Sequence, residues 1–216
     1  MPKLNKITLQ AALDCNDIYT ALKVLEKISP YIDVAELGTG LMISEGTRAV
    51  RELRKEYPDL ILLSDIKLMD GGAPLAQIVL DAGADIVTVL GAAADNTIKG
   101  VADIAKEYGG QSFVDLICVS DISGRAAEID ALGVDYIGVH TSYDLRTSVA
   151  APLDDLKKLK KCVKTAKTSI SGGIHLAAIR DIVKERPDNI IVGGGIMNAE
   201  DQKEAAELIY KAIQDS

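Results

Sequence analysis

The stretch Ile7-Thr8-Leu9-Gln10-Ala11-Ala12-Leu13-Asp14-Cys15 decides between the two architectures that the rest of the chain allows. It is a strand-like apolar run that ends in an aspartate and contains no glycine. A doubly wound open sheet normally carries a glycine-rich GxGxxG turn after its first strand. Because that turn is absent here, the stretch favours a closed barrel over an open sheet.

Further strand patterns of this kind recur along the chain, and each is followed by a helical pattern. The expected strands are residues 7–13, 32–37, 60–65, 84–90, 112–117, 135–139, 168–171 and 189–193. They are apolar on both faces, as buried parallel strands are. Eight strand–helix units in 216 residues predict an α/β protein, a single (β/α)8 TIM-type barrel in which residues 1–216 form one domain.

Local signals mark several of the expected helices. Asp17 is expected to cap the first helix, because a short carboxylate satisfies free N–H groups there. Pro58 is expected to end the helix after the second strand. The last helix is expected to run through residues 205–213.

Composition places the chain among ordered globular proteins. Hydrophobic residues make up 48% of it and charged residues 26%, which excludes a disordered chain. The net charge of −8 argues against general nucleic-acid binding. The lysines within residues 157–161 lie beside Asp154 and Asp155, so we interpret this cluster as a solvated helix face.

No targeting or membrane segment is expected. The longest apolar runs, such as Leu60-Ile61-Leu62-Leu63, are too short to cross a bilayer, and no signal peptide is recognised at the start. Cys15, Cys118 and Cys162 are odd in number and form no CxxC pair. We therefore expect reduced thiols and a cytoplasmic protein.

Carboxylates gather at the carboxyl ends of the expected strands, where the active site of such a barrel lies. Asp14 ends the first strand, and Glu36 and Asp65 lie at the ends of the next two. Asp115 lies within the fifth. A buried carboxylate is costly unless it is paired, so each could belong to a structural ion pair, but their convergence favours a functional site. Glu36 and Asp65 supply hard oxygen ligands that, with substrate oxygens and waters, could hold one Mg²⁺.

Two basic residues accompany these carboxylates. Lys67 lies two residues after Asp65 and three before Asp70, and neighbouring carboxylates keep a lysine charged. It could then donate to a developing oxyanion. His140 follows the sixth strand and could transfer a proton near neutral pH. The alternative for Lys67 is an ordinary surface lysine in a loop, and the alternative for His140 is a hydrogen-bonded histidine at a strand end. His175 is interpreted as a helix-entry or surface residue.

Two glycine clusters follow the last two expected strands. They are Gly172-Gly173 and Gly193-Gly194-Gly195. In barrels of this type these two loops bind phosphate through main-chain N–H groups, and glycine lets the main chain approach the anion closely. The clusters therefore predict a phosphorylated substrate.

Several longer stretches resemble the orotidine monophosphate decarboxylase superfamily over nearly the whole chain. The chain is most similar there to the 3-hexulose-6-phosphate synthases, with the 3-keto-L-gulonate-6-phosphate decarboxylases as close relatives. The Asp-x-Lys-x-x-Asp motif of residues 65–70 is the most specific piece. The similar stretches are residues 9–14, 36–39, 65–72, 82–91, 133–141 and 192–196.

The resemblance implies a homodimer with shared active sites, in which Asp70 reaches the site of the partner subunit. It implies Mg²⁺ on Glu36 and Asp65, phosphate on the late glycine loops, and an enediolate intermediate that the metal stabilises. It also implies that Asp14 binds a sugar hydroxyl and that Asp115 is one of the inward polar residues.

One loop separates the two branches of this family. Decarboxylases typically carry His-Arg-x-Arg-Asp after the sixth strand, whereas this chain has His140-Thr141-Ser142-Tyr143-Asp144, which is closer to the synthase pattern His-Thr-Gly-x-Asp. Gly194 stands where decarboxylases tend to have arginine. The chain departs from the synthase pattern at Ser142, at Leu145-Arg146 and at Val149.

The resemblance thus implies an aldehyde-lyase that joins formaldehyde to ribulose 5-phosphate or splits the product. The alternative is decarboxylation of 3-keto-L-gulonate 6-phosphate or a related sugar phosphate. A pentulose-phosphate epimerase is less consistent with the chain, because that family uses histidine metal ligands where this chain has Glu36 and Asp65. A non-catalytic sugar-phosphate sensor would not need Lys67 between two carboxylates.

Overall fold

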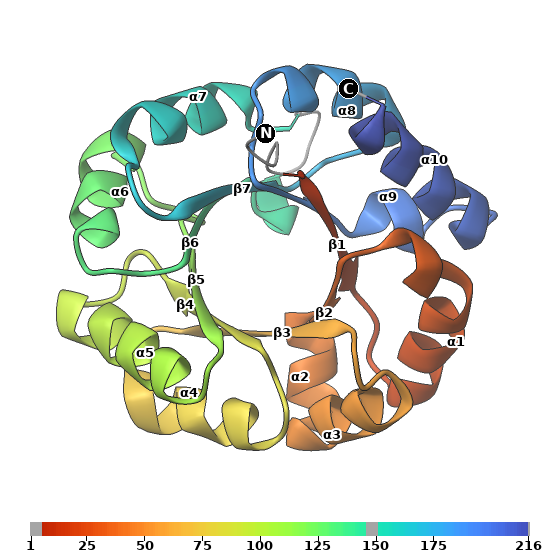
Figure 1. Cartoon of the computed structure of the whole chain (residues 1–216), viewed down its shortest axis with the longest axis horizontal. Coiled ribbons are helices and arrows are strands. Elements are labelled where there is room, and N and C mark those ends of the chain that lie inside the picture. The colour runs from red at the N-terminus through yellow and green to blue at the C-terminus, as the bar shows by residue number, and fades with distance from the viewer. Residues whose placement is uncertain (1–5, 146–150, 216) are drawn as a thin grey trace, which may run out of the picture.

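The computed structural model describes residues 6–145 and 151–215, and it is a closed barrel of parallel strands surrounded by helices (Figure 1). The strands pair in chain order, and β1 closes the barrel against β8. Their bounds are β1 Thr8–Leu13, β2 Val34–Leu37, β3 Ile61–Leu68, β4 Ile86–Leu90, β5 Gln111–Asp115, β6 Tyr136–His140, β7 Lys167–Ser171 and β8 Asn189–Val192. The predicted (β/α)8 barrel is confirmed.

The helices cover the outside of the barrel, one or two after each strand. They are α1 Ile18–Ile28, α2 Thr39–Glu45, α3 Thr47–Glu56, α4 Gly72–Asp81, α5 Asp95–Glu107, α6 Ile122–Asp130, α7 Leu153–Cys162, α8 Leu176–Lys184, α9 Gly194–Met197 and α10 Gln202–Gln214, with short 3₁₀ turns η1 Ser29–Tyr31 and η2 Tyr143–Leu145. The Asp17 carboxylate caps α1 by accepting from Thr20 N, as predicted. The helix that Pro58 was expected to end stops at Glu56.

Four predicted strand ends were wrong. β5 ends at Asp115 and not at residue 117, and β8 ends at Val192 and not at residue 193. The other two errors concern the predicted catalytic residues Lys67 and His140. β3 continues to Leu68, so Lys67 lies inside the strand rather than after it. His140 is the last residue of β6 rather than the residue following it. The sequence pattern did not predict the true end of β3, because the pairing of β3 with β4 is irregular between Ser64 and Leu68. This irregularity breaks the two-residue alternation of side chains along the strand.

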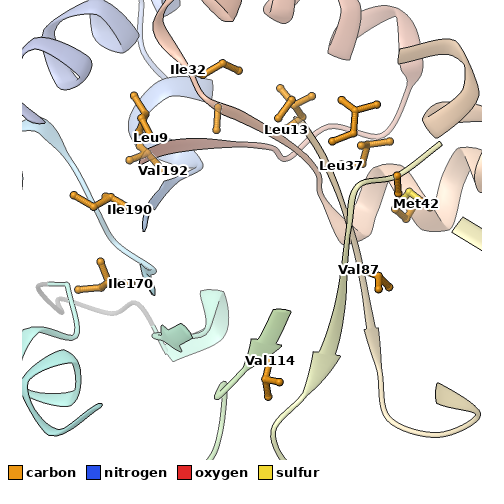
Figure 2. Packing of buried hydrophobic residues seen from close by; sticks show 14 of the residues in the cluster. Leu9, Leu13, Ile32, Leu37, Met42, Val87, Val114, Ile170, Ile190 and Val192 are labelled. Carbon is orange, nitrogen blue, oxygen red and sulfur yellow. The ribbon is translucent and has the colours of Figure 1, made fainter. Parts of the chain in front are cut away.

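The core has two layers, divided by the barrel wall. The outer layer packs strand side chains against helices, and Figure 2 shows part of it, from Leu9 and Leu13 on β1 to Val192 on β8. The inner layer fills the barrel itself, where the rings of Phe113 and Tyr136 stack with centroids 5.8 Å apart. The inner layer consists of Ala12, Val34, Leu63, Ile86, Phe113, Tyr136 and Ile191.

A repeated hydrogen bond ties the strands together in pairs at their amino-terminal ends. The residue immediately before each even-numbered strand is an aspartate, and its carboxylate accepts from a main-chain N–H of the preceding odd-numbered strand. The four bonds run from Leu9 N to Asp33 (2.9 Å), Leu62 N to Asp85 (2.7 Å), Ser112 N to Asp135 (2.8 Å) and Thr168 N to Asp188 (2.7 Å). We call Asp33, Asp85, Asp135 and Asp188 the clamp aspartates.

The interpretation of the lysine cluster as a solvated helix face agrees with the structure. The lysines of residues 157–161 lie on α7, where Lys157 and Lys158 pair with Asp154 and Asp155. Cys15, Cys118 and Cys162 are free thiols. Within the described residues, none of the helices combines the length and the apolar character needed to cross a membrane.

Candidate active site

The carboxyl ends of the strands surround a cavity of about 390 Å³. Eight of the predicted site residues line it, and they come from seven strands or the loops that follow them. These eight are Asp14, Glu36, Asp65, Lys67, Asp115, His140, Gly172 and Gly193. Asp70, Gly173, Gly194 and Gly195 are not among the lining residues. The sequence therefore located most of the cavity, although it did not assign every residue to it.

Lys67 lines this cavity and is held between two carboxylates. Its Nζ lies 2.9 Å from Asp65 Oδ2 and 3.1 Å from Asp115 Oδ2. Burial opposes the charge of Lys67, but the negative charges of Asp65 and Asp115 outweigh it and raise the pKa of the ammonium above its usual value. Lys67 is therefore a fixed cation and hydrogen-bond donor at neutral pH rather than a base.

Asp115 joins this lysine to the histidine. Its Oδ2 also lies 2.9 Å from His140 Nδ1, and its Oδ1 accepts from Ile117 N at 2.9 Å. Although burial works against ionisation, the hydrogen bond and charge of His140 and the charge of Lys67 lower the pKa of Asp115. An ionised Asp115 accepts a hydrogen bond from Nδ1 of His140. Nε2 is then the ring nitrogen that can exchange a proton with a substrate. The orienting role of Asp115 was not predicted, because it requires the neighbouring positions of β5 and β6.

Two buried side-chain amides form a chain of hydrogen bonds that ends at Glu36. Gln10 Nε2 donates to Glu36 Oε2 at 2.6 Å, and Asn189 Nδ2 donates to Gln10 Oε1 at 2.8 Å. Burial, with the negative charge of Asp65, raises the pKa of Glu36. Sequence reasoning missed Gln10, although its position two residues before Ala12 and four before Asp14 on one strand face was a usable signal.

The pair Glu36 and Asp65 fits a divalent cation of the Mg²⁺ type. Both side chains are buried and both offer hard oxygen donors. A cation would offset the burial and the repulsion from Asp65 that together raise the pKa of Glu36. Within residues 6–145 and 151–215 no group of three or more His, Cys, Asp or Glu side chains is arranged to hold a metal. The donor set therefore suits an ion that completes its coordination with water and substrate oxygens.

Glycines make room for Asp14 at the edge of the cavity. A Cβ atom at Gly193 would lie 2.5 Å from Asp14 Oδ2, and one at Gly38 would lie 2.8 Å from Asp14 Oδ1. Both distances are shorter than side-chain carbon atoms allow. The carboxylate of Asp14 therefore lies close against two loops at the wall of the cavity, and a side chain at either glycine would displace it.

The two late glycine loops also contact one another. A Cβ at Gly195 would lie 2.5 Å from the carbonyl oxygen of Ile174, next to Gly173. Gly172 has a φ of +93°, and its Cβ would lie 2.4 Å from the carbonyl oxygen of Thr141. Glycine is thus required by packing at both loops, and the phosphate site expected there stays a prediction.

Asp70 lies apart from the cavity of its own chain. It is exposed in the loop between β3 and α4, and its Oδ1 accepts from Gly71 N at 2.8 Å. Nearby apolar side chains are also exposed, with Met69 at 53%, Leu75 at 44% and Ile78 at 52%. This surface is compatible with the expected placement of Asp70 in a partner's site, which no contact within one chain can test.

His175 is the N-cap residue of α8, as predicted for a helix-entry histidine. Tyr143 lines the cavity in the loop that separates the two branches of the resembled family, and its side chain is 79% exposed. Arg146 and Val149, the other departures in that loop, lie outside the described residues.

Comparison with known proteins identifies the family of this site. Residues 8–209 match the Orotidine 5'-phosphate decarboxylase / HUMPS family. The chain belongs to this family. A 3-hexulose-6-phosphate synthase of Bacillus subtilis is 46% identical over 205 residues, which are 95% of this chain and 98% of that protein. The predicted resemblance and the prediction of a carbon–carbon lyase are thereby confirmed.

Solved structures give the same result. The structure of 3-hexulose-6-phosphate synthase from Salmonella typhimurium has a TM-score of 0.94 at 36% identity and covers 97% of this chain and 99% of its own. That of 3-keto-L-gulonate-6-phosphate decarboxylase from Vibrio cholerae has a TM-score of 0.81 at 29% identity, covering 97% and 98%. Both branches of the family therefore share this fold over its full length.

Proposed function

We propose that this enzyme is a 3-hexulose-6-phosphate synthase, which joins formaldehyde to ribulose 5-phosphate and catalyses the reverse cleavage. The observation that supports it most is Lys67 fixed between Asp65 and Asp115 in a cavity that also contains His140, in a chain 46% identical to a protein of that name. The synthase structure from Salmonella typhimurium is also more similar to this chain than the decarboxylase structure from Vibrio cholerae, at 36% against 29% identity.

The chemistry follows from the charges of the site. A proton leaves the carbon next to the ketone of ribulose 5-phosphate, and the electron pair forms an enediolate. The enediolate carbon then attacks formaldehyde, one carbon–carbon bond forms, and the oxygen of formaldehyde gains a proton. Nε2 of His140, oriented through Asp115, is the group we assign to proton transfer.

Lys67 stabilises the negative oxygen of the enediolate in this scheme. Its ammonium is held in place by two carboxylates before the reaction begins, so little reorganisation accompanies the development of charge. Mg²⁺ bound by Glu36 and Asp65 would supply further positive charge at the same oxygens. Asp14 binds a sugar hydroxyl, and the loops of Gly172 and Gly193 hold the phosphate.

A second candidate is decarboxylation of 3-keto-L-gulonate 6-phosphate, because the structure of such a decarboxylase shares the fold at 29% identity. It needs an acid that protonates the enediolate. Tyr143 lines the cavity where the decarboxylase pattern has arginine, and a phenol lacks the fixed positive charge and the fork of N–H donors of a guanidinium group. We therefore expect formaldehyde condensation to exceed decarboxylation.

A substrate panel tests this proposal. Purified protein is assayed with ribulose 5-phosphate plus formaldehyde and with 3-keto-L-gulonate 6-phosphate, each with and without EDTA. We expect the first reaction to be faster and to be lost on chelation, and Mg²⁺ to restore it. Faster decarboxylation would overturn the choice of substrate, and full activity after exhaustive chelation would overturn the metal.

We also propose a homodimer with shared sites. The exposed Asp70 and the exposed apolar side chains of Met69 in the same loop and of Leu75 and Ile78 in the following helix support it, because exposed apolar side chains are common at interaction surfaces. Asp70→Ala and Lys67→Ala subunits should each be inactive alone, and after subunit exchange they should regain about a quarter of the parental activity. No recovery despite exchange, or a fully active monomer, would contradict shared sites.

A further inference from the structure

The strand that carries the central lysine is irregular at the lysine itself. Pairing of β3 with β4 is regular up to Ser64 and resumes at Leu68. Residues 65–67 therefore stand opposite a single residue of β4, which is Thr88. Bulges of this kind redirect side chains and are common beside active sites.

The bulge puts Lys67 in an unusual main-chain conformation. Its φ is +44°, in the left-handed region that L-residues other than glycine seldom occupy. Cys118 and Arg186 also have positive φ, but they lie in loops, whereas Lys67 is inside a strand. Such a conformation persists only where surrounding contacts stabilise it.

The hydroxyl of Thr88 makes the contacts that meet this need. It accepts a hydrogen bond from Lys67 N at 2.9 Å, and it donates one to Asp65 Oδ1 at 2.9 Å. Thr88 is 3% exposed, so water could not easily replace these bonds. One hydroxyl therefore fixes both the main chain of the lysine and the carboxylate that faces its ammonium.

We propose that Thr88 is a positioning residue that holds the bulge and aligns Lys67 with Asp65 for the reaction. Thr88 lines the cavity, but its single proton is donated to Asp65 and its oxygen accepts from Lys67 N, so we assign it to the positioning of these two residues. This role rests on the proposed function only in that Lys67 and Asp65 perform the chemistry. The bonds themselves can be tested without any substrate.

Thr168 on β7 offers a matched control at the other end of the barrel. It is 5% exposed, and its Oγ1 also donates to an aspartate, Asp188, at 3.0 Å. The two threonines thus share residue type, burial and partner type. Replacing either by valine removes a hydroxyl and keeps the shape, but only Thr88 contacts the lysine.

The experiment compares Thr88→Val, Thr88→Ser and Thr168→Val. We expect Thr88→Val to lower kcat by about 10–10²-fold with KM within about threefold, because misplacement of reacting groups affects the chemical step. Thr88→Ser, which keeps the hydroxyl, should stay within about threefold of the parent. Thr168→Val should lower Tm by a similar amount to Thr88→Val and leave kcat unchanged.

A second measurement follows the bond directly. Hydrogen exchange of the Lys67 amide, observed by NMR after lysine-selective ¹⁵N labelling, should accelerate at least about tenfold in Thr88→Val and in neither of the other variants. Should Thr88→Val not fold, Thr88→Cys replaces it, because a thiol is a weak donor and acceptor of similar size to serine.

The outcomes separate the two proposals. An unchanged Lys67 amide, a kcat within threefold of the parent in Thr88→Val, or an equal loss of kcat in Thr168→Val would overturn the role of Thr88. Absence of synthase and decarboxylase turnover in the parent protein would overturn the proposed function instead. The amide exchange alone would then decide whether Thr88 holds the bulge.

Discussion

At the amino-terminal end of the barrel each clamp aspartate accepts from main-chain N–H groups, whereas at the carboxyl end Asp65 and Asp115 face the side chain of Lys67. The clamp aspartates are spaced around the barrel, one for each pair of strands. The carboxylates at the other end crowd around one ammonium. Each clamp aspartate thus ties two strands together, whereas Asp65 and Asp115 hold a charged side chain in the cavity.

The largest expected difference between the two ends concerns lysine. Lys67→Ala should lower kcat by about 10²–10³-fold or more, since one preorganised donor to the oxyanion is lost. Lys6→Ala is the matched control, because Lys6 pairs with the clamp residue Asp33 at 2.9 Å. It should leave kcat unchanged. Both variants are compared with the parent by steady-state kinetics, and circular dichroism checks that they are folded. A kcat of Lys67→Ala within about threefold of the parental value would contradict the role of Lys67 in the reaction.

The clamp aspartates should affect stability and leave activity unchanged. Asp188→Ala leaves Thr168 N, a buried main-chain donor, without its carboxylate partner, so the free energy of unfolding should fall by about 1–3 kcal/mol. Asp188→Asn keeps one acceptor oxygen and should lose less. Urea unfolding and kcat are measured together. A loss of kcat without a loss of stability would show that the two ends are not separate in function.

Another carboxylate satisfied by main chain gives the comparison a pH dependence. Asp130 accepts from Lys164 N at 2.8 Å and from Ala166 N at 2.7 Å. Burial opposes ionisation, but these bonds outweigh it and lower the pKa of Asp130 below that of the unfolded chain. Its stabilisation is therefore present above the unfolded pKa and is lost as the pH falls through the folded value.

Asp130→Asn should accordingly reduce the unfolding free energy near pH 7 by about 1–2 kcal/mol. The difference from the parent should shrink as the pH falls below about 4, near the ordinary aspartate pKa. Urea midpoints between pH 7 and pH 3 measure it. A difference that stays constant or grows toward low pH would refute the assignment.

The smallest expected effect comes from a buried group that neither end uses. Ser64 is fully buried on β3, and its Oγ has no hydrogen-bond partner among the described residues. Ser64→Ala should therefore be neutral or stabilising by a few tenths of a kcal/mol to about 1 kcal/mol. Thermal unfolding tests this, and a clear loss of stability would mean that the hydroxyl has a partner, such as water.

The sequence predicted the barrel because each strand is a short apolar run between turn and cap signals. It predicted the cavity because carboxylates, a lysine and a histidine stood at strand ends. It could not predict that Lys67 lies within β3, since the bulge opposite Thr88 interrupts the alternation. It could not assign Asp115 to His140 either, because that contact depends on how β5 and β6 lie side by side.

The clamp aspartates also group the strands of the barrel into consecutive pairs. Each joins an odd-numbered strand to the even-numbered strand after it, while Leu60, Gly110 and Ala166, which precede β3, β5 and β7, have no carboxylate. A break in the chain after an even-numbered strand would leave every clamp within one piece, and a break after an odd-numbered strand would separate a clamp from its partner. New termini for a circular permutation, or the boundary between two fragments meant to reassemble, therefore belong between β2 and β3, β4 and β5, or β6 and β7.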